Sequence, residues 1–311
     1  LDLIDYMQEW FRSTELPSYL IGGVEAVNVL DGDELKTMVT FSISNIEDTE
    51  GVVELQFRTG GGPRMMGGSS SSDNITKLVH LDGNQTKEIN MLLSGSPRGG
   101  TINTLTSKNI PSSIRMDWGR LEEDDKKIPF EGERILDKPV EMIAAGEIVV
   151  DNEDEGFEIT TLTQGSRLRN WLLATEDEEM KYSSFNQWRP PLGWTLATNS
   201  DFYGTSIRSA YYAAAGNGDQ IAKWHVPLQG EGFYSVYVYL YRPWGRGRDR
   251  TEYNYTLHHA DGEEEIPVEV RDKGWYYLGA YYFKEDMTTV EMSNLSSGRM
   301  VVADAVKFVK Q

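Results

Sequence analysis

The chain has 311 residues, and 49 acidic side chains against 30 basic ones give it a net charge of −19. A surface this negative repels nucleic-acid phosphates and anionic lipids, so nucleic acid is not an expected partner. The absence of cysteine excludes disulfides and thiol nucleophiles, and no apolar run reaches the roughly 18 residues of a membrane span, so no direct membrane insertion is expected.

The first residues carry the one convincing helical period of the sequence. The apolar side chains that would share one helix face are Leu3, Ile4, Met7, Trp10 and Phe11. Pro17 would end this helix, so we expect an N-terminal helix within residues 1–16. The sequence starts at Leu1 without a methionine or a leader, so this helix either caps the following domain or is the tail of a preceding one.

From Tyr19 the hydrophobic period changes to two. The run from Leu35 to Ile43 alternates apolar and polar residues, which is typical of a half-buried strand. About six or seven such runs, separated by turn signals, predict an immunoglobulin-like β-sandwich over residues 17–118. Residues 119–146 are charged and contain two prolines, so we expect an irregular linker there.

The second half of the chain has longer and more aromatic strand patterns. About ten candidate strands with almost no helix predict a jelly-roll β-sandwich, of the galactose-binding-like kind, over residues 147–311. A polar insertion at 163–193 interrupts the series. The predicted fold class is therefore all-β, with two β-sandwiches in tandem.

Seven short motifs in this second half occur in a fixed order. They are Val150-Asp151-Asn152 with Gly156-Phe157, Tyr211 to Ala215, Ala222 to Trp224, Gly232 to Tyr237, Tyr255 to His259, Trp275 with Leu278-Gly279, and Val301 to Val306. In order and spacing they resemble the golvesin C-terminal-like domain, which is also found at the end of xanthan lyases. The resemblance implies a non-catalytic, carbohydrate-binding-like sandwich attached to secreted or cell-surface enzymes. It also implies an extracytoplasmic location: periplasmic, cell-surface or secreted.

A second resemblance concerns the start of the chain. The segments Tyr6 to Phe11 and Leu16 to Tyr19 are similar to the end of the helical domain of gluzincin-type zinc aminopeptidases. In those proteins a β-sandwich follows such a segment. The zinc motif of that family is absent here, so this resemblance implies a catalytic domain upstream of Leu1 as a partner in the same polypeptide.

The strongest ligand-binding candidate is an arginine-rich segment between two predicted strands. Four arginines and a tryptophan lie within the nine residues 242–250, and the predicted ligand-binding side chains there are Trp244, Arg246, Arg248 and Arg250. Guanidinium groups bind carboxylates in a bidentate manner, and an indole face stacks on sugar rings, which would suit an acidic glycan or a peptide carboxylate. The alternative is that the arginines pair with Asp249 and Glu252, or seal a domain interface.

The strand before this segment offers a second candidate. Its natural core face consists of Tyr234, Val236, Val238 and Leu240. The opposite face carries Phe233, Tyr237, Tyr239 and Tyr241. Tyr237 and Tyr239 are therefore predicted to offer a flat surface for sugar rings, and another strand repeats the theme with Trp275, Tyr277, Tyr281 and Phe283. The alternative is that a neighbouring domain or the insertion covers these rings.

Metal ligands are sparse. His258 and His259 are adjacent on a strand and point to opposite faces, so they do not easily share an ion. Asp151 and Asp304 are candidates for Ca²⁺, but the acidic run 151–155 lacks an EF-hand pattern and a solvated turn is the default interpretation. The sequence therefore predicts no metal and no other cofactor.

These observations favour a non-catalytic accessory module of a larger extracytoplasmic bacterial protein that binds a polysaccharide or cell-surface glycan. The motifs HExxH and GxSxG are absent, so we expect no enzyme activity. Two alternatives stay open. The chain is a spacer or docking domain of a zinc peptidase-like parent without a glycan ligand, or it is a polysaccharide-degrading enzyme.

Overall fold

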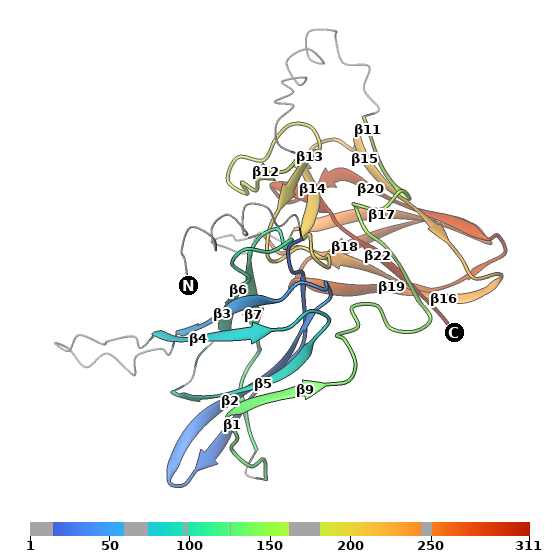
Figure 1. Cartoon of the computed structure of the whole chain (residues 1–311). Coiled ribbons are helices and arrows are strands. Elements are labelled where there is room, and N and C mark those ends of the chain that lie inside the picture. Colours follow the sequence, from blue (N-terminus) through green and yellow to red (C-terminus); the bar gives the residue numbers. More distant parts are fainter. Residues whose placement is uncertain are drawn as a thin grey trace. The chain divides into compact units, whose positions relative to one another are not determined.

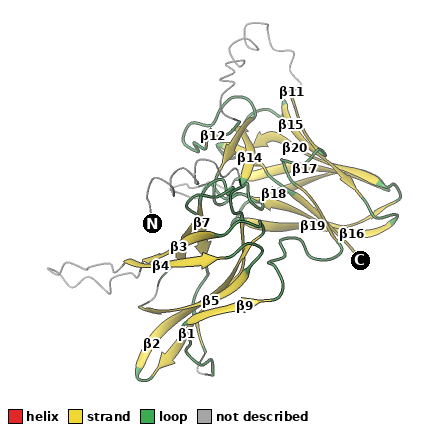
Figure 2. Ribbon diagram, in the orientation of Figure 1, coloured by secondary structure: helices red, strands yellow, loops and turns green. Residues whose placement is uncertain are grey.

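The computed structural model describes residues 15–58, 74–95, 97, 99–124, 126–161, 181–243 and 251–311 (Figure 1). Every regular element in these ranges is a β-strand, which confirms the predicted all-β class (Figure 2). The expected N-terminal helix lies outside the described residues. Within the described ranges no helix could cross a membrane.

The chain divides into two compact units. The first comprises Leu1–Met142 with Thr205–Ile207, and the second comprises Ile143–Gly204 with Arg208–Gln311. The sequence predicts domains at 17–118 and 147–311 with a linker at 119–146, and these domain bounds stay predictions.

The first unit is a sandwich of two sheets. One sheet has the strand order β8 (Glu122–Glu123), β1 (Tyr19–Asp31), β2 (Glu34–Asn45), β5 (Thr86–Ser94) and β9 (Gly132–Leu136). The other has the order β4 (Asn74–Leu81), β3 (Gly51–Arg58), β6 (Gly99–Asn103) and β7 (Ser113–Asp117). Inward side chains of both sheets, such as Phe41 of β2 and Leu55 of β3, form one apolar cluster. The alternating sequence pattern thus places one face of each strand in a shared core.

The expected irregular linker at 119–146 contains strands that the sequence pattern does not reveal. Gly132–Leu136 forms β9, which pairs with β5 from Thr86↔Leu136 to Asn90↔Gly132. Its side chains are mostly exposed, and Glu133 forms an ion pair with Lys87 at 3.1 Å. Backbone hydrogen bonds and charged pairs, not apolar burial, hold this edge strand, so hydrophobic periodicity cannot detect it.

The described residues of the second unit form three sheets. The first has the order β10 (Glu147–Val150), β22 (Val306–Lys310), β16 (Gly232–Leu240) and β19 (Gly274–Phe283). The second has the order β11 (Phe157–Thr161), β15 (Gln220–Pro227), β20 (Met287–Ser296), β17 (Glu252–His259) and β18 (Gly262–Glu269). A smaller sheet has the order β12 (Ser183–Ser184), β13 (Thr195–Thr198), β14 (Ser209–Ala214) and β21 (Met300–Ala303).

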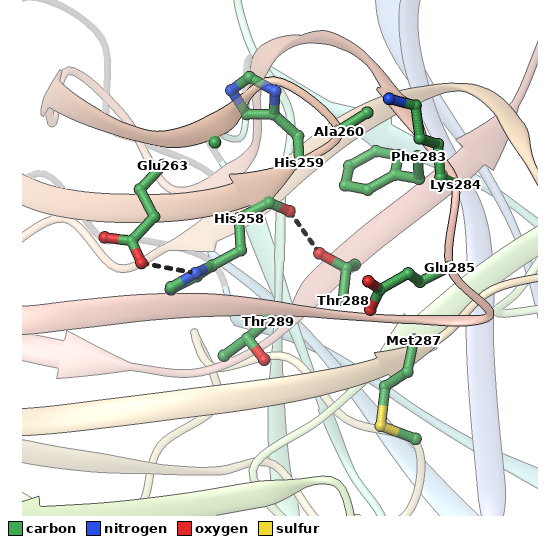
Figure 3. Close-up of a pocket in the computed structure, with 11 residues that line it drawn as sticks. His258, His259, Ala260, Glu263, Phe283, Lys284, Glu285, Met287, Thr288 and Thr289 are labelled. Carbon is green, nitrogen blue, oxygen red and sulfur yellow. Dashed lines mark hydrogen bonds and ion pairs between the residues drawn. The ribbon is translucent and has the colours of Figure 1, made fainter.

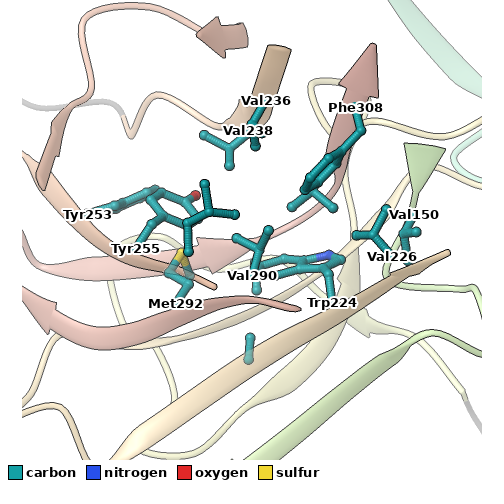
Figure 4. Close-up of a cluster of buried hydrophobic side chains, with 14 of the residues drawn as sticks. Val150, Trp224, Val226, Val236, Val238, Tyr253, Tyr255, Val290, Met292 and Phe308 are labelled. Carbon is teal, nitrogen blue, oxygen red and sulfur yellow. The ribbon is translucent and has the colours of Figure 1, made fainter. Parts of the chain in front are cut away.

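The first two sheets of this unit pack face to face around a common core (Figure 4). Val236 and Val238 of β16 lie opposite Trp224 of β15 and Tyr255 of β17 in this cluster. Trp224 is 1% exposed, and its indole Nε1 donates to the backbone oxygen of Asp304 at 3.2 Å. Burial of each large side chain contributes roughly 1.5–3 kcal/mol, so this core dominates the stability of the unit. The opposite face of each sheet points away from this core.

A β-bulge in β19 determines which of its rings face outward. Val236 pairs with Gly279 but Tyr237 pairs with Tyr277, so Leu278 is an extra residue in β19. After this extra residue the alternation is reversed, and Tyr281 and Phe283 pack against the core. The expectation that one aromatic surface is formed by Trp275, Tyr277, Tyr281 and Phe283 is therefore wrong. Of these four rings, only Trp275 and Tyr277 lie on the outward face.

Candidate functional site

The predicted ligand-binding residues fall into two groups. Trp244, Arg246, Arg248 and Arg250 lie outside the described residues, and their role stays a prediction. Arg242, at the start of the segment, is described and forms an exposed ion pair with Asp272 at 3.0 Å. Tyr237 and Tyr239 are described, and the site is built around them.

Four rings on β16 and β19 form what we call the aromatic platform, which consists of Tyr237, Tyr239, Trp275 and Tyr277. Antiparallel pairing places Tyr237 opposite Tyr277 and Tyr239 opposite Trp275. The ring centroids are 5.3 Å apart in both pairs. Directly opposed residues on neighbouring strands bring side chains into contact, so the sheet itself sets this arrangement.

The four rings differ in exposure. Tyr277 is 57% exposed, whereas Tyr237, Tyr239 and Trp275 are half-buried. Tyr203 packs edge-on against Trp275 at 5.0 Å and lies 5.6 Å from Tyr239, measured between ring centroids. Burial raises the pKa of Tyr239 well above its ordinary value, so this phenol stays neutral. One end of the platform is thus anchored in the protein, and the other end is open to solvent.

A lysine on the neighbouring strand β22 completes the surface. Lys307 pairs with Tyr237 across the strands, and its Nζ lies 5.2 Å from the Tyr237 ring centroid and 5.0 Å from that of Trp275. The same Nζ is 2.9 Å from Oε1 of Glu147 on β10. Burial opposes ionisation of Glu147, but hydrogen bonds from Lys307 and the Ala144 amide outweigh it and lower the pKa of Glu147. The pair adds polar groups to the platform without adding net charge.

A separate hollow of about 450 Å³ lies beside the turns that join β17 to β18 and β19 to β20 (Figure 3). His258 Nδ1 is 3.3 Å from Glu263, and Thr288 Oγ1 donates to the backbone oxygen of His258 at 2.5 Å. The phenyl ring of Phe283 in its lining is only 3% exposed. The hollow therefore offers hydrogen-bonding groups but little ring surface for stacking.

One histidine lies between a hydroxyl and an acid, as in a hydrolytic triad. His225 Nδ1 is 3.3 Å from Thr289 Oγ1, and its Nε2 is 3.4 Å from Glu158. The histidine and glutamate side chains are 38% and 54% exposed, so water screens their interaction. Thr289 also lies within β20, whereas a nucleophilic hydroxyl of this type usually sits on a sharp turn. We interpret these contacts as cross-strand contacts on a solvated face.

The remaining histidines contact separate carboxylates. His258 faces Glu263 and, through Nε2, Glu291 at 3.7 Å, whereas His259 lies 3.7 Å from Glu264. In the first unit, exposed His80 has Glu50 3.2 Å from Nε2 and Asp82 3.8 Å from Nδ1. One ligand atom from each of these three residues lies within 4.8 Å of the others, but all three side chains are exposed, so the trio by itself does not indicate a metal site.

A protein-family model described as the Golvesin C-terminal domain matches residues 180–310. This confirms the resemblance seen in the sequence motifs for this part of the chain. No curated protein shows significant similarity to the chain, and the resemblance to zinc aminopeptidases finds no support.

Several solved structures show distant similarity to the chain. An exo-β-1,3-galactanase from Phanerochaete chrysosporium is 10% identical with a TM-score of 0.32, covering 92% of this chain and 68% of the galactanase. A CBM22 tandem domain from Paenibacillus barcinonensis is 9% identical with a TM-score of 0.26, covering 94% of both chains. A cycloisomaltooligosaccharide glucanotransferase from a Paenibacillus species is 8% identical with a TM-score of 0.27, covering 94% of this chain and 72% of that enzyme. At these TM-scores the similarities carry no conclusion about function.

Proposed function

We propose that the second unit is a carbohydrate-binding module whose ligand lies on the aromatic platform. The observation that carries the proposal is the pairing of Tyr237 with Tyr277 and of Tyr239 with Trp275 on an outward sheet face. The carbon-bound hydrogens of a sugar ring pack on aromatic faces, and neighbouring hydroxyls need polar partners at the edge of the rings. Lys307 and Glu147 supply such partners beside Tyr237 and Trp275.

The charge of the platform favours a neutral glycan. Lys307 already has Glu147 as its counter-ion at 2.9 Å, so it is not an open site for a uronate carboxylate. An acidic polysaccharide would also be repelled by a chain of net charge −19. The segment with Trp244, Arg246, Arg248 and Arg250 follows β16 closely in sequence, and we propose that it adds contacts to the same ligand. On a neutral glycan, in place of the acidic one expected from the sequence, the arginines would donate hydrogen bonds to sugar hydroxyls and Trp244 would stack on a ring.

The match to the Golvesin C-terminal domain supports an accessory, non-catalytic role in a larger extracytoplasmic protein. The ligand is then a polysaccharide or a cell-surface glycan. If the chain instead serves only as a spacer or docking domain, the platform rings will be covered by another part of the parent protein and will bind no sugar.

A glycan array probed with the intact chain tests the proposal. We expect binding to one class of neutral polysaccharide and its loss in the double variant Tyr237→Ala, Tyr277→Ala. The matched control is His225→Ala, Thr289→Val, which alters the outward face of the other sheet and should bind normally. Absence of binding to any glycan, or equal loss in both double variants, would refute the platform. Turnover of a bound polysaccharide would support the enzymatic alternative.

A further inference from the structure

The connection between β21 and β22 buries an incompletely paired carboxylate. Asp304 is 1% exposed, and its Oδ2 accepts a hydrogen bond from the Tyr203 amide at 3.1 Å. Its Oδ1 has no hydrogen-bond partner. A buried charge without compensation is strongly unfavourable, so this carboxylate needs either a proton or a positive partner.

A second carboxylate lies beside it. Val150 pairs with Val306 at the end of β10, so the next residue, Asp151, lies next to the segment that contains Asp304. Asp151 Oδ1 accepts a hydrogen bond from the Asn152 amide at 2.8 Å. Burial raises the pKa of Asp151 to about 8, and the charges of Asp154 and Glu153 contribute. Burial also raises the pKa of Asp304, and the charge of Asp151 adds to this effect.

A buried hydroxyl without a hydrogen-bond partner belongs to the same cluster. Tyr203 is 8% exposed, and its hydroxyl has no hydrogen-bond partner. Burial and then the charges of Asp151, Glu147, Asp304 and Asp154 raise the pKa of Tyr203 to about 12. An oxygen that lies among carboxylates without bonding to any of them is expected where a further group belongs between them.

The charges of the cluster do not balance. Glu147 is paired with Lys307, and Glu153 is paired with Lys181 at 2.6 Å. The cation that acts on Asp304 is Arg208, whose guanidinium donates to the Ser200 backbone oxygen at 3.3 Å. When both are ionised, Asp151 and Asp304 carry two negative charges against this one guanidinium, so a bound cation would lower the cost of ionising them.

We propose that Asp304 and Asp151 bind one Ca²⁺ ion, with the Tyr203 hydroxyl beside it. All of these groups are oxygen ligands, which favour a hard cation such as Ca²⁺ over zinc or copper. The ion would fix the end of β10 to the segment before β22. Because Tyr203 packs on Trp275 and Tyr239, it would also hold the buried end of the platform.

Calcium binding to the full chain, stripped with a chelator, tests this site independently of any glycan. We expect titration calorimetry to show one Ca²⁺ per chain, and Ca²⁺ to raise the unfolding temperature by about 4 °C or more. Asp304→Asn and Asp151→Asn keep the side-chain shape and remove a charge, so each should weaken Ca²⁺ binding at least tenfold. Asp286→Asn makes the same change at an exposed turn residue and should bind Ca²⁺ normally.

Two results would overturn the proposal. The first is no Ca²⁺ binding by the unaltered chain up to about 1 mM, the weak end of the range for extracellular calcium sites. The second is unaltered binding in Asp151→Asn and Asp304→Asn. If Asp304→Asn does not fold, Asp151→Asn and direct calorimetry of the unaltered chain decide alone. If either overturning result is obtained, a proton and not Ca²⁺ neutralises Asp304.

Discussion

The two large sheets of the second unit enclose one core but present different outward faces. The face on β16, β19 and β22 carries the aromatic platform with Lys307. The face on β11, β15, β20 and β17 carries charged and polar side chains, in which Lys223 pairs with Glu291 at 2.5 Å and His225 pairs with Glu158 at 3.4 Å. Both faces cover the same apolar cluster.

The charged face needs no outward rings, as expected for a solvated sheet face. Tyr277 is 57% exposed and so gains little from burial. This contrast supports the proposal that the aromatic platform binds a ligand.

The largest effect is expected from deleting Leu278, the extra residue of the bulge in β19. Without it, β19 alternates regularly, so Trp275 and Tyr277 stay outward and Tyr281 and Phe283 stay inward. We expect a loss of about 2 kcal/mol in the free energy of unfolding, measured by urea denaturation, because the half-buried Leu278 side chain no longer packs against the core.

The control for this deletion is Leu278→Ala, which keeps the bulge and removes only part of a side chain. It should cost about as much as the deletion, since both variants lose the packing of Leu278. A much larger loss of stability in the deletion variant would show that the rings do not keep their faces without the bulge.

The bulge also marks the limit of what the sequence could predict. In β16 the alternation is regular, and Tyr234, Val236, Val238 and Leu240 are all fully buried as predicted. In β19 one extra residue reverses the pattern, and the sequence signal for it is Gly279, an isolated glycine within a strand that directly follows Leu278. Tyr241, expected on the outward face, is 4% exposed and lies 5.3 Å from Phe202 between ring centroids, because β16 ends at Leu240.

The candidate sites could be predicted only in part, because they depend on the pairing of strands that are far apart in the sequence. The orientation of Tyr237 and Tyr239 followed from local alternation, but their partners Trp275 and Tyr277 depend on the pairing of β16 with β19. Asp151 and Asp304 could be named from sequence as oxygen ligands. Their proximity follows from the pairing of β10 with β22, strands that are far apart in the chain.

The next largest effect concerns the exposed end of the platform. Tyr277→Ala should weaken glycan binding about tenfold, which corresponds to roughly 1.4 kcal/mol. Because this ring is largely exposed, the unfolding temperature should barely change. Calorimetric titration and thermal unfolding of the same samples measure the two quantities. A large loss of stability without a loss of affinity would assign Tyr277 to packing.

The pair of Lys307 and Glu147 should give a smaller, pH-dependent effect. The pKa of Glu147 is lowered in the folded state, so its contribution is present above the ordinary glutamate pKa and is lost as pH falls through the folded-state value. We expect about 1 kcal/mol from the pair at neutral pH. Unfolding of Glu147→Gln followed against pH should show a weaker loss in acid. An acid response identical to that of the unaltered chain would contradict this assignment.

The smallest effect belongs to the charged face. In a double-mutant cycle of Lys223→Ala and Glu291→Ala, the coupling energy should stay below about 1 kcal/mol, since water screens such pairs. Glycan affinity should not change in either single variant. A loss of glycan binding here would remove the contrast between the two faces.

The most direct test is to map the bound glycan by amide chemical shifts in the intact chain. The account predicts that titration with the bound polysaccharide fragment shifts signals from β16, β19 and β22 around Tyr237 and Tyr277. Shifts confined to β15, β20 and β17 around His225, or to the first unit, would contradict it.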